Sequence, residues 1–147
     1  MTITPYPSDL LVSNMYVIED GGHAIVVDPS RDTAPARGLA IDKILITHEH
    51  YDHISGVNAW KEISHAPLLC SARCAERIRD PRKNVARHFD AFCQLQTMLS
   101  DYSLPETEPA YACFADEVFE DEISFDWRGH RLRLFEIPGH SPGSVPA

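Results

Sequence analysis

Ile44-Leu45-Ile46-Thr47-His48-Glu49-His50-Tyr51-Asp52-His53 is a short apolar run followed at once by three histidines and an aspartate. The apolar run is typical of a strand that is buried on both faces. In an extended segment, residues two positions apart point the same way, so His48 and His50 can converge on one metal ion. Asp52 and His53, after the chain turns, can face a second ion. The spacing therefore suits two adjacent metal ions at the carboxyl end of a buried strand.

A catalytic zinc ion has three protein ligands and an open position for water. His140 is the best candidate for the third ligand of the first ion, because the breaker-rich segment 138–144 directly follows a predicted strand. The loop that carries His48 and His50 and the loop that carries His140 would then lie at the same edge of the sheet. Asp28 follows another predicted strand and has two possible roles, a carboxylate that supports a ligand or a simple Asp-Pro turn. The remaining histidines have no companion donors at fixed spacing, so we expect no ligand role for His23, His65, His88 and His130.

Strands and helices alternate along the first two thirds of the chain. Two β-runs within 15–27, joined by a glycine turn, predict a hairpin. We expect a helix over 55–63, a short strand over 67–70, and a helix from the N-cap Ser71 to about Arg79. Asp80-Pro81 predicts a further helix that ends near Ser100. Its apolar face would consist of Val85, Phe89, Phe92 and Leu95.

The last third contains one more predicted hairpin. Residues 123–127 and 131–135 alternate between apolar and polar side chains on either side of a turn at 128–130. We expect a loop over 101–109 and solvated surface over the acidic run 116–122. Together these elements predict an α/β (α+β) fold, a mixed layered sheet in a single domain over residues 1–147.

Composition limits the classes of function. The 147 residues include 13 basic and 22 acidic side chains, for a net charge of −9, and 44% are hydrophobic. This composition is globular, and the acidic balance argues against nucleic acid as the main partner. No run approaches the roughly 20 apolar residues needed to cross a bilayer, and the start carries no secretion-type leader, so we expect a cytoplasmic protein without a membrane partner. The four cysteines are expected to be thiols.

The motifs resemble those of the metallo-β-lactamase superfamily. The signature H-x-H-x-D-H of that family is matched by His48, His50, Asp52 and His53, and the segment 138–144 with His140 is similar to its second metal-binding motif. The resemblance implies an αββα sandwich with metal ions at the edge of its sheets, and hydrolysis by a metal-activated hydroxide. The amino-acid sequences of these loops are most similar to those of glyoxalase II-like thioesterases.

The resemblance also implies ligands that this sequence does not contain. In the family, an aspartate that bridges two metal ions and a final histidine follow the Gly-His loop, whereas this sequence ends at Ala147. We therefore expect a C-terminally truncated domain with an incomplete second half and impaired activity. Uncovered strand edges tend to pair with another copy, so a homodimer or a domain-swapped oligomer is expected.

The leading hypothesis is a zinc-dependent hydrolase with one or two ions, although iron or manganese would suit the same ligands. Asp52 would orient the attacking water or accept its proton. The substrate would be a small ester, thioester or related acyl compound. The rival hypothesis is a non-catalytic metal-binding remnant or an interaction module. A row of basic residues, either an anion-attracting face or a solvated one, comprises Arg73, Arg77, Arg79, Lys83 and Arg87.

Overall fold

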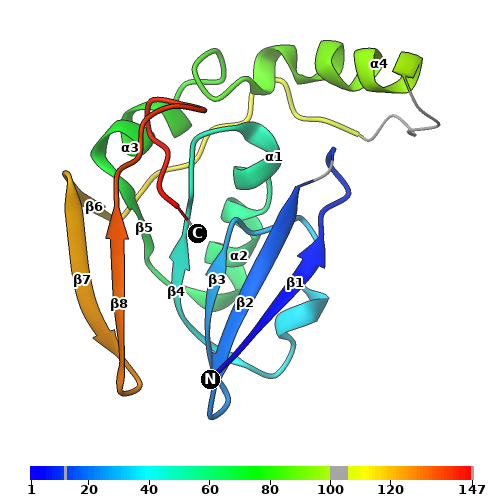
Figure 1. The fold of residues 1–147 in the computed structure, drawn as a ribbon. Helices are drawn as coiled ribbons and strands as arrows, with labels where there is room; N and C mark the ends of the chain where they lie inside the picture. The colour runs from blue at the N-terminus through cyan, green and yellow to red at the C-terminus, as the bar shows by residue number, and fades with distance from the viewer. Residues whose placement is uncertain (12, 100–105, 147) are drawn as a thin grey trace.

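Six strands form the main sheet of the protein, in the order β1-β2-β3-β4-β5-β6 (Figure 1). The computed structural model describes residues 1–11, 13–99 and 106–146. The strands β1 to β3 pair antiparallel, and the strands β3 to β6 pair parallel. Their bounds are β1 Thr2–Pro7, β2 Asn14–Asp20, β3 His23–Val27, β4 Ala40–Leu45, β5 Leu68–Ser71 and β6 Glu117–Phe119.

Helices connect the parallel strands, as parallel pairing requires. Helices α1 (Tyr51–Ile54) and α2 (Val57–Ser64) lie between β4 and β5, and α3 (Ala72–Ile78) follows β5. The predicted N-cap is confirmed, because the hydroxyl of Ser71 accepts a hydrogen bond from the backbone N–H of Cys74 at 3.1 Å. The remaining helical elements are η1 Ala34–Ala36, η2 Ala86–His88 and α4 Phe89–Leu99.

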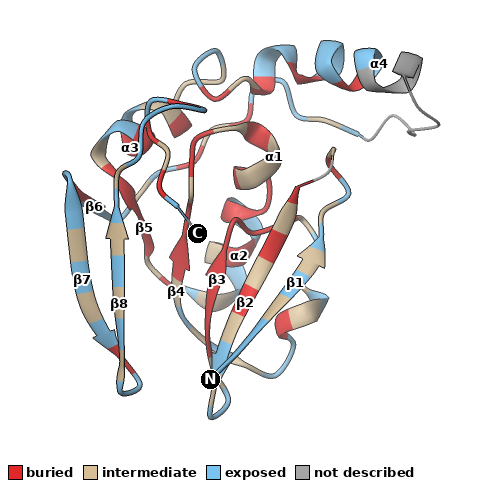
Figure 2. Ribbon diagram, in the orientation of Figure 1, coloured by how far each residue is buried: buried red, intermediate tan, exposed pale blue. Residues whose placement is uncertain are grey.

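Both faces of the central strands are buried (Figure 2). On β3, Val26 packs on the helix side while Ile25 packs on the opposite side. On β4 the same alternation places Ile44 with the helices and Leu45 on the other face. The apolar residues at every position from Ile44 to Ile46 explain why the end of β4 is recognisable in the sequence as a strand covered on both faces.

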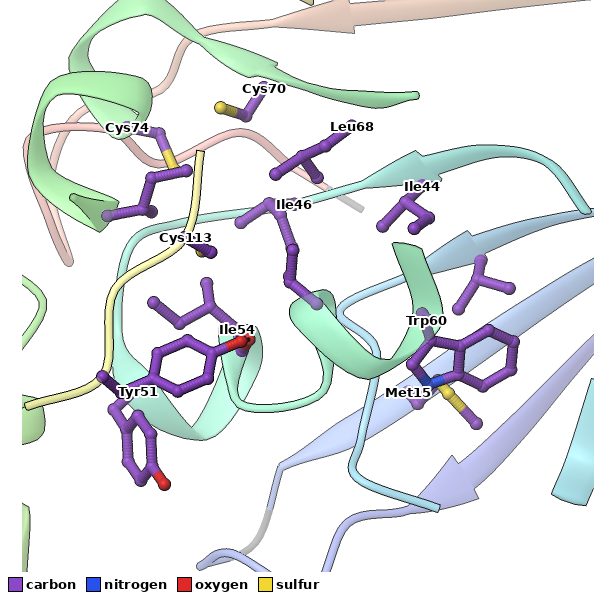
Figure 3. Packing of buried hydrophobic residues seen from close by; sticks show 14 of the residues in the cluster. Met15, Ile44, Ile46, Tyr51, Ile54, Trp60, Leu68, Cys70, Cys74 and Cys113 are labelled. Carbon is purple, nitrogen blue, oxygen red and sulfur yellow. Dashed lines mark hydrogen bonds between the residues drawn. The ribbon is translucent and has the colours of Figure 1, made fainter. Parts of the chain in front are cut away.

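The helix-side core includes Tyr51, which belongs to the histidine motif (Figure 3). Tyr51 and Ile54 of α1 and Trp60 of α2 are all 0% exposed. The ring of Tyr51 contacts Phe89 edge to face at a centroid separation of 5.0 Å. The indole N–H of Trp60 donates to the carbonyl of Ser30 at 2.8 Å, which fixes α2 to the segment after β3. The loop that carries the motif therefore rests on rigid, close-packed residues.

The opposite face of the sheet is covered by a hairpin of β7 (Glu122–Trp127) and β8 (His130–Phe135). Trp127 is 8% exposed, and its indole N–H donates to Asp42 of β4 at 2.8 Å. Helices, six-stranded sheet and hairpin form successive layers, which confirms the mixed α/β fold (Figure 1). Within the residues described, this hairpin is all there is of the second sheet.

The helix predicted from Asp80 is wrong over its first part. Val85 has φ +62°, in the left-handed region, and the chain becomes α-helical only at Phe89. The buried amide of Asn84 donates to the carbonyls of Ile78 and Tyr111 and holds this turn in place of a helix. Phe92 and Leu95 are more than half exposed, so the expected apolar face is not buried as a whole. The predicted end at Ser100 and most of the predicted loop lie outside the described residues.

Two short strands escaped prediction from the sequence. The strand β1 is an edge strand with two prolines, and β6 lies within the acidic run that was expected to be solvated surface. Neither has the clear alternation that marks a half-buried strand. In the part of the chain that the structure describes, no helix combines the length and apolarity needed to cross a membrane. All four cysteines are buried and free.

Candidate metal centre

The histidine motif leaves the end of β4 and sends alternate side chains to opposite sides. His48 and His50 come together on one side, with ring centroids 4.7 Å apart. Glu49 and Tyr51, which are interleaved with them, are both 0% exposed and point into the protein. The buried pair fixes the backbone, and the two imidazoles are presented to a common space.

His140 reaches the same space from the far end of the chain. Its Nε2 lies 3.2 Å from Nδ1 of His50, and its ring centroid lies 4.9 Å from that of His48. One nitrogen from each of His48, His50 and His140 falls within 4.8 Å of the other two. The structure therefore brings together the three residues expected around a first metal ion.

Asp28 orders the donors around this space. Its Oδ1 accepts from the backbone N–H of Thr47 at 2.7 Å, while its Oδ2 accepts from the Thr47 hydroxyl at 2.6 Å and from Nδ1 of His53 at 2.9 Å. Because the Thr47 hydroxyl donates to Asp28, it is left to accept from Nδ1 of His48 at 3.0 Å. Nε2 of His48 is then a lone pair, and it is buried without a hydrogen-bond partner.

The residues expected around a second ion are adjacent to the first three. Oδ2 of Asp52 lies 3.4 Å from Nε2 of His53, whose other ring nitrogen donates to Asp28. The ring centroid of His53 lies 4.1 Å from that of His48. Nitrogens of His48 and His53 together with Asp28 form a second group of close ligand atoms. The role of Asp28 as a supporting carboxylate is thus favoured over a simple turn.

The electrostatics of the cluster favour neutral imidazoles at His48 and His50. Burial, together with the neighbouring histidines, lowers the pKa of His48 to about 3. Burial and His140 lower the pKa of His50. Burial also opposes charge on His53, but the hydrogen bond and charge of Asp28 outweigh it and raise the pKa of His53. Burial raises the pKa of Asp52. Neutral imidazole is the form that binds a metal ion.

The other histidines lie elsewhere. Nδ1 of His23 lies 2.9 Å from Asp42, and Nε2 of His130 lies 3.5 Å from Asp20. These two histidines are the first residues of β3 and β8, whereas the cluster follows the end of β4. His65 and His88 are exposed. In the basic row, Arg73, Arg77 and Lys83 form ion pairs with Glu136, Glu49 and Glu76 respectively, so this row is not a single free cationic face.

Comparison with known proteins agrees with the motifs and the layers. A sequence model of the metallo-beta-lactamase superfamily matches residues 8–146, nearly the whole chain. The chain belongs to the metallo-β-lactamase superfamily. Among solved structures, the metallo-β-lactamase BLEG-1, of class B3, superposes with a TM-score of 0.73 and 25% identity over 98% of this chain and 65% of that one. FEZ-1 from Legionella gormanii superposes with a TM-score of 0.66 and 19% identity over 97% and 53% of the two chains, a likeness of fold alone.

Curated members of the superfamily with similar sequence are named hydroxyacylglutathione hydrolase. That of Stenotrophomonas maltophilia (strain R551-3) is 52% identical over 48 residues, or 29% of this chain and 18% of its own. That of Aeromonas hydrophila subsp. hydrophila is 27% identical over 137 residues, or 89% of this chain and 40% of its own. This superfamily chain therefore spans well under half the length of these curated relatives.

One buried neighbour of the cluster could not be identified from the spacing of the motif. Glu49 lies between two predicted ligands, yet the spacing of the motif assigned it no role. The alternation of side chains in an extended segment was the available signal, because a carboxylate between two histidines that face the metal space points to the opposite side, where it must be exposed or paired. What pairs it, Arg77 and the loop of His140, depends on tertiary structure.

Proposed function

We propose that this chain is a metal-dependent hydrolase of a small acyl compound, an ester or a thioester. His48, His50 and His140 would hold one ion, and Asp52 and His53 would contribute to a second. The observation that carries the proposal is the meeting of His140 with His50 at 3.2 Å. The names of the curated relatives describe hydrolysis of a hydroxyacylglutathione, which supports an acyl substrate for this chain.

The donor set suits a divalent cation. Three imidazoles crowd together, and the buried Nε2 of His48 has no hydrogen-bond partner, which is costly unless a ligand uses it. Imidazole nitrogens and carboxylate oxygens are ligands of zinc, and iron and manganese accept them as well. Zinc is our proposed metal because neutral imidazole dominates the first group.

The bound ion would supply a lowered pKa for a water molecule and polarisation of the substrate carbonyl. The residues of the chain do the rest. Asp52 lies beside His53, and burial raises the pKa of Asp52. Its carboxylate is therefore placed to orient the attacking water and to receive a proton from that water. Asp28 fixes the ring orientations of His48, through Thr47, and of His53. We propose Asp52 as the catalytic residue and Asp28 as the carboxylate that supports His48 and His53.

The second candidate is a metal-binding remnant or interaction module without turnover. Bound metal without hydrolysis of any acyl substrate would favour this alternative.

An assay of turnover by the purified full chain distinguishes the hydrolase from the non-catalytic alternative. The chain, loaded with zinc, is assayed against a chromogenic thioester, a chromogenic ester and a β-lactam. We expect thioester or ester hydrolysis that a chelator abolishes and added zinc restores. His48→Ala should abolish it, whereas His88→Ala, at an exposed histidine outside the cluster, should not. Turnover that survives the chelator, or that His48→Ala leaves intact, would refute the proposal.

We also propose that the partner of this chain is a second copy of itself. An apolar hollow of about 400 Å³ lies between the sheet and the hairpin. Its lining includes Ile3 of β1, which is 56% exposed on an edge strand. Exposed apolar edges favour pairing between copies. We further propose a cytoplasmic location, on the composition alone.

A further inference from the structure

Glu49 is a fully buried carboxylate in the middle of the metal motif. It is 0% exposed, although it stands between His48 and His50, which face the proposed ions. Its side chain points the other way, beneath the cluster. Burying a carboxylate is costly unless charged and polar partners satisfy both of its oxygens. The partners of Glu49 therefore indicate what its burial achieves.

One oxygen of Glu49 holds the loop that carries His140. Its Oε2 accepts from the hydroxyl of Ser141 at 2.8 Å and from the backbone N–H of Gly143 at 3.2 Å. Ser141 is 4% exposed, whereas its neighbour His140 is exposed. The two hydrogen bonds thus fix the residues immediately after His140 to the residue between the other two histidines.

The loop fits closely around this carboxylate. A Cβ at Gly143 would lie 2.8 Å from Oε2 of Glu49 and 2.7 Å from the backbone nitrogen of Cys74, so only glycine allows this approach. The carbonyl of Gly143 accepts from the Ser71 hydroxyl at 3.1 Å. The loop is therefore held from the motif and from the start of α3 together.

The other oxygen of Glu49 is paired with a cation. Nε of Arg77, on α3, lies 2.5 Å from Oε1, and the two atoms form an ion pair without hydrogen-bond geometry. The side chain of Arg77 is 31% exposed to solvent, whereas that of Glu49 is 0% exposed. A cation therefore lies on one side of Glu49, and the hydrogen-bond donors of the loop lie on the other. A carboxylate suits both, whereas an amide must turn its NH₂ group either toward the cation or toward the loop donors.

We infer that Glu49 is a positioning residue, which holds the loop 139–144 so that His140 reaches the metal ligands His48 and His50. The inference rests on the proposed function for the role of His140 as a ligand. Glu49 itself contacts neither a proposed ion nor substrate, and it acts through the loop. A residue of this kind, behind a metal ligand, changes metal affinity on the order of 10- to 100-fold when it is replaced.

The test compares Glu49→Gln with Glu76→Gln, a glutamate on the exposed side of α3 that pairs with Lys83. The first measurement is amide hydrogen exchange in the metal-free protein. We expect the Gly143 amide to exchange at least about 10-fold faster in Glu49→Gln, because an amide group must turn its donor toward one of the two sides. Exchange of the β3 amides should be unchanged, which separates local release of the loop from unfolding.

The second measurement is zinc affinity, by competition with a chromogenic chelator, in wild-type and His140→Ala backgrounds. Glu49→Gln should weaken binding on the order of 10- to 100-fold in the wild-type background and less than about 2-fold once His140 is absent. Ser141→Ala, which keeps the Arg77 pair, should act in the same direction and serves if Glu49→Gln fails to fold.

The outcomes distinguish the two hypotheses. Unchanged Gly143 exchange in Glu49→Gln and Ser141→Ala, or an equal loss of affinity in both backgrounds, would overturn the role of Glu49 while leaving the metal site intact. A wild-type chain that binds no zinc would refute the proposed function, and the exchange of Gly143 in the metal-free protein would then decide by itself whether Glu49 holds the loop.

Discussion

Nε2 of His140 lies 3.2 Å from Nδ1 of His50, although the two residues are 90 positions apart in the chain. Local sequence cannot bring them together. The contact depends on the loop after β8 crossing to the end of β4, where the backbone N–H of Val145 donates to the carbonyl of Thr47 at 2.7 Å. The proposed metal centre is therefore a product of the whole fold, and its properties should respond to changes outside the ligands.

Asp28→Asn should weaken zinc binding on the order of 10- to 100-fold. Asp28 accepts three hydrogen bonds, from Thr47 and His53, and an amide nitrogen must then face one of these donors. Asparagine tolerates the φ of +51° at this position, so the backbone should not change. Competition with a chelator measures the affinity. Asp126→Asn, at an exposed carboxylate of β7, is the matched control, and equal affinities for the two variants would show that Asp28 does not order the donors.

Gly56→Ala should destabilise the protein by more than about 2 kcal/mol. A Cβ at Gly56 would lie 2.1 Å from the carbonyl oxygen of Ser30 and 2.5 Å from that of Pro29, so the backbone would have to shift beneath the motif. At Gly139 a Cβ meets nothing within 4 Å, so Gly139→Ala should change the free energy of unfolding by less than about 1 kcal/mol. Urea unfolding measures both variants, and similar values for the two would contradict this packing.

Much of the scaffold could be predicted from the sequence. The hairpin of β2 and β3, the strands β4 and β5 and the N-cap Ser71 are confirmed, because each depends on a local pattern or on continuous burial. The turn at Val85 could not be predicted, since the buried Asn84 that holds it acts through Tyr111, far along the chain.

Only part of the candidate site could likewise be predicted from the sequence. The spacing of the motif predicted that His48 and His50 would meet, and the position of the segment 138–144 after a predicted strand pointed to His140, as did the resemblance to a family. The partners of Asp28 and Glu49 could not be predicted, because each carboxylate is satisfied by residues from other elements of the fold. Which residues support a ligand depends on tertiary contacts, even where the ligands themselves follow a local spacing.

The buried thiol of Cys113 should make the protein less stable as the pH rises from about 9 to 12. Burial raises its pKa to about 12, from 9.0 for an ordinary thiol. In that interval the unfolded chain loses the thiol proton while the folded chain keeps it, so the free energy of unfolding falls by up to about 1.4 kcal/mol per pH unit from this group. Urea unfolding at pH 8, 9.5 and 10.5 measures the slope. Cys113→Ala should show a shallower decline, and parallel curves for the two proteins would contradict the prediction.

Self-association should depend on the edge of the sheet. Ile3 lies on the edge strand β1 and lines the apolar hollow beside the hairpin. Light scattering at micromolar concentration should give a mass of two or more chains, and Ile3→Lys should reduce it toward one chain, since a lysine on an edge opposes pairing. A parent protein that is monomeric under these conditions would refute the proposal.

The metal content of the purified chain tests the central claim most directly. After exposure to zinc and removal of free ions, elemental analysis should find at least one bound zinc ion per chain in the parent and in His88→Ala, and a clear loss in His140→Ala. A parent protein with almost no bound metal, or an undiminished content in His140→Ala, would contradict the account.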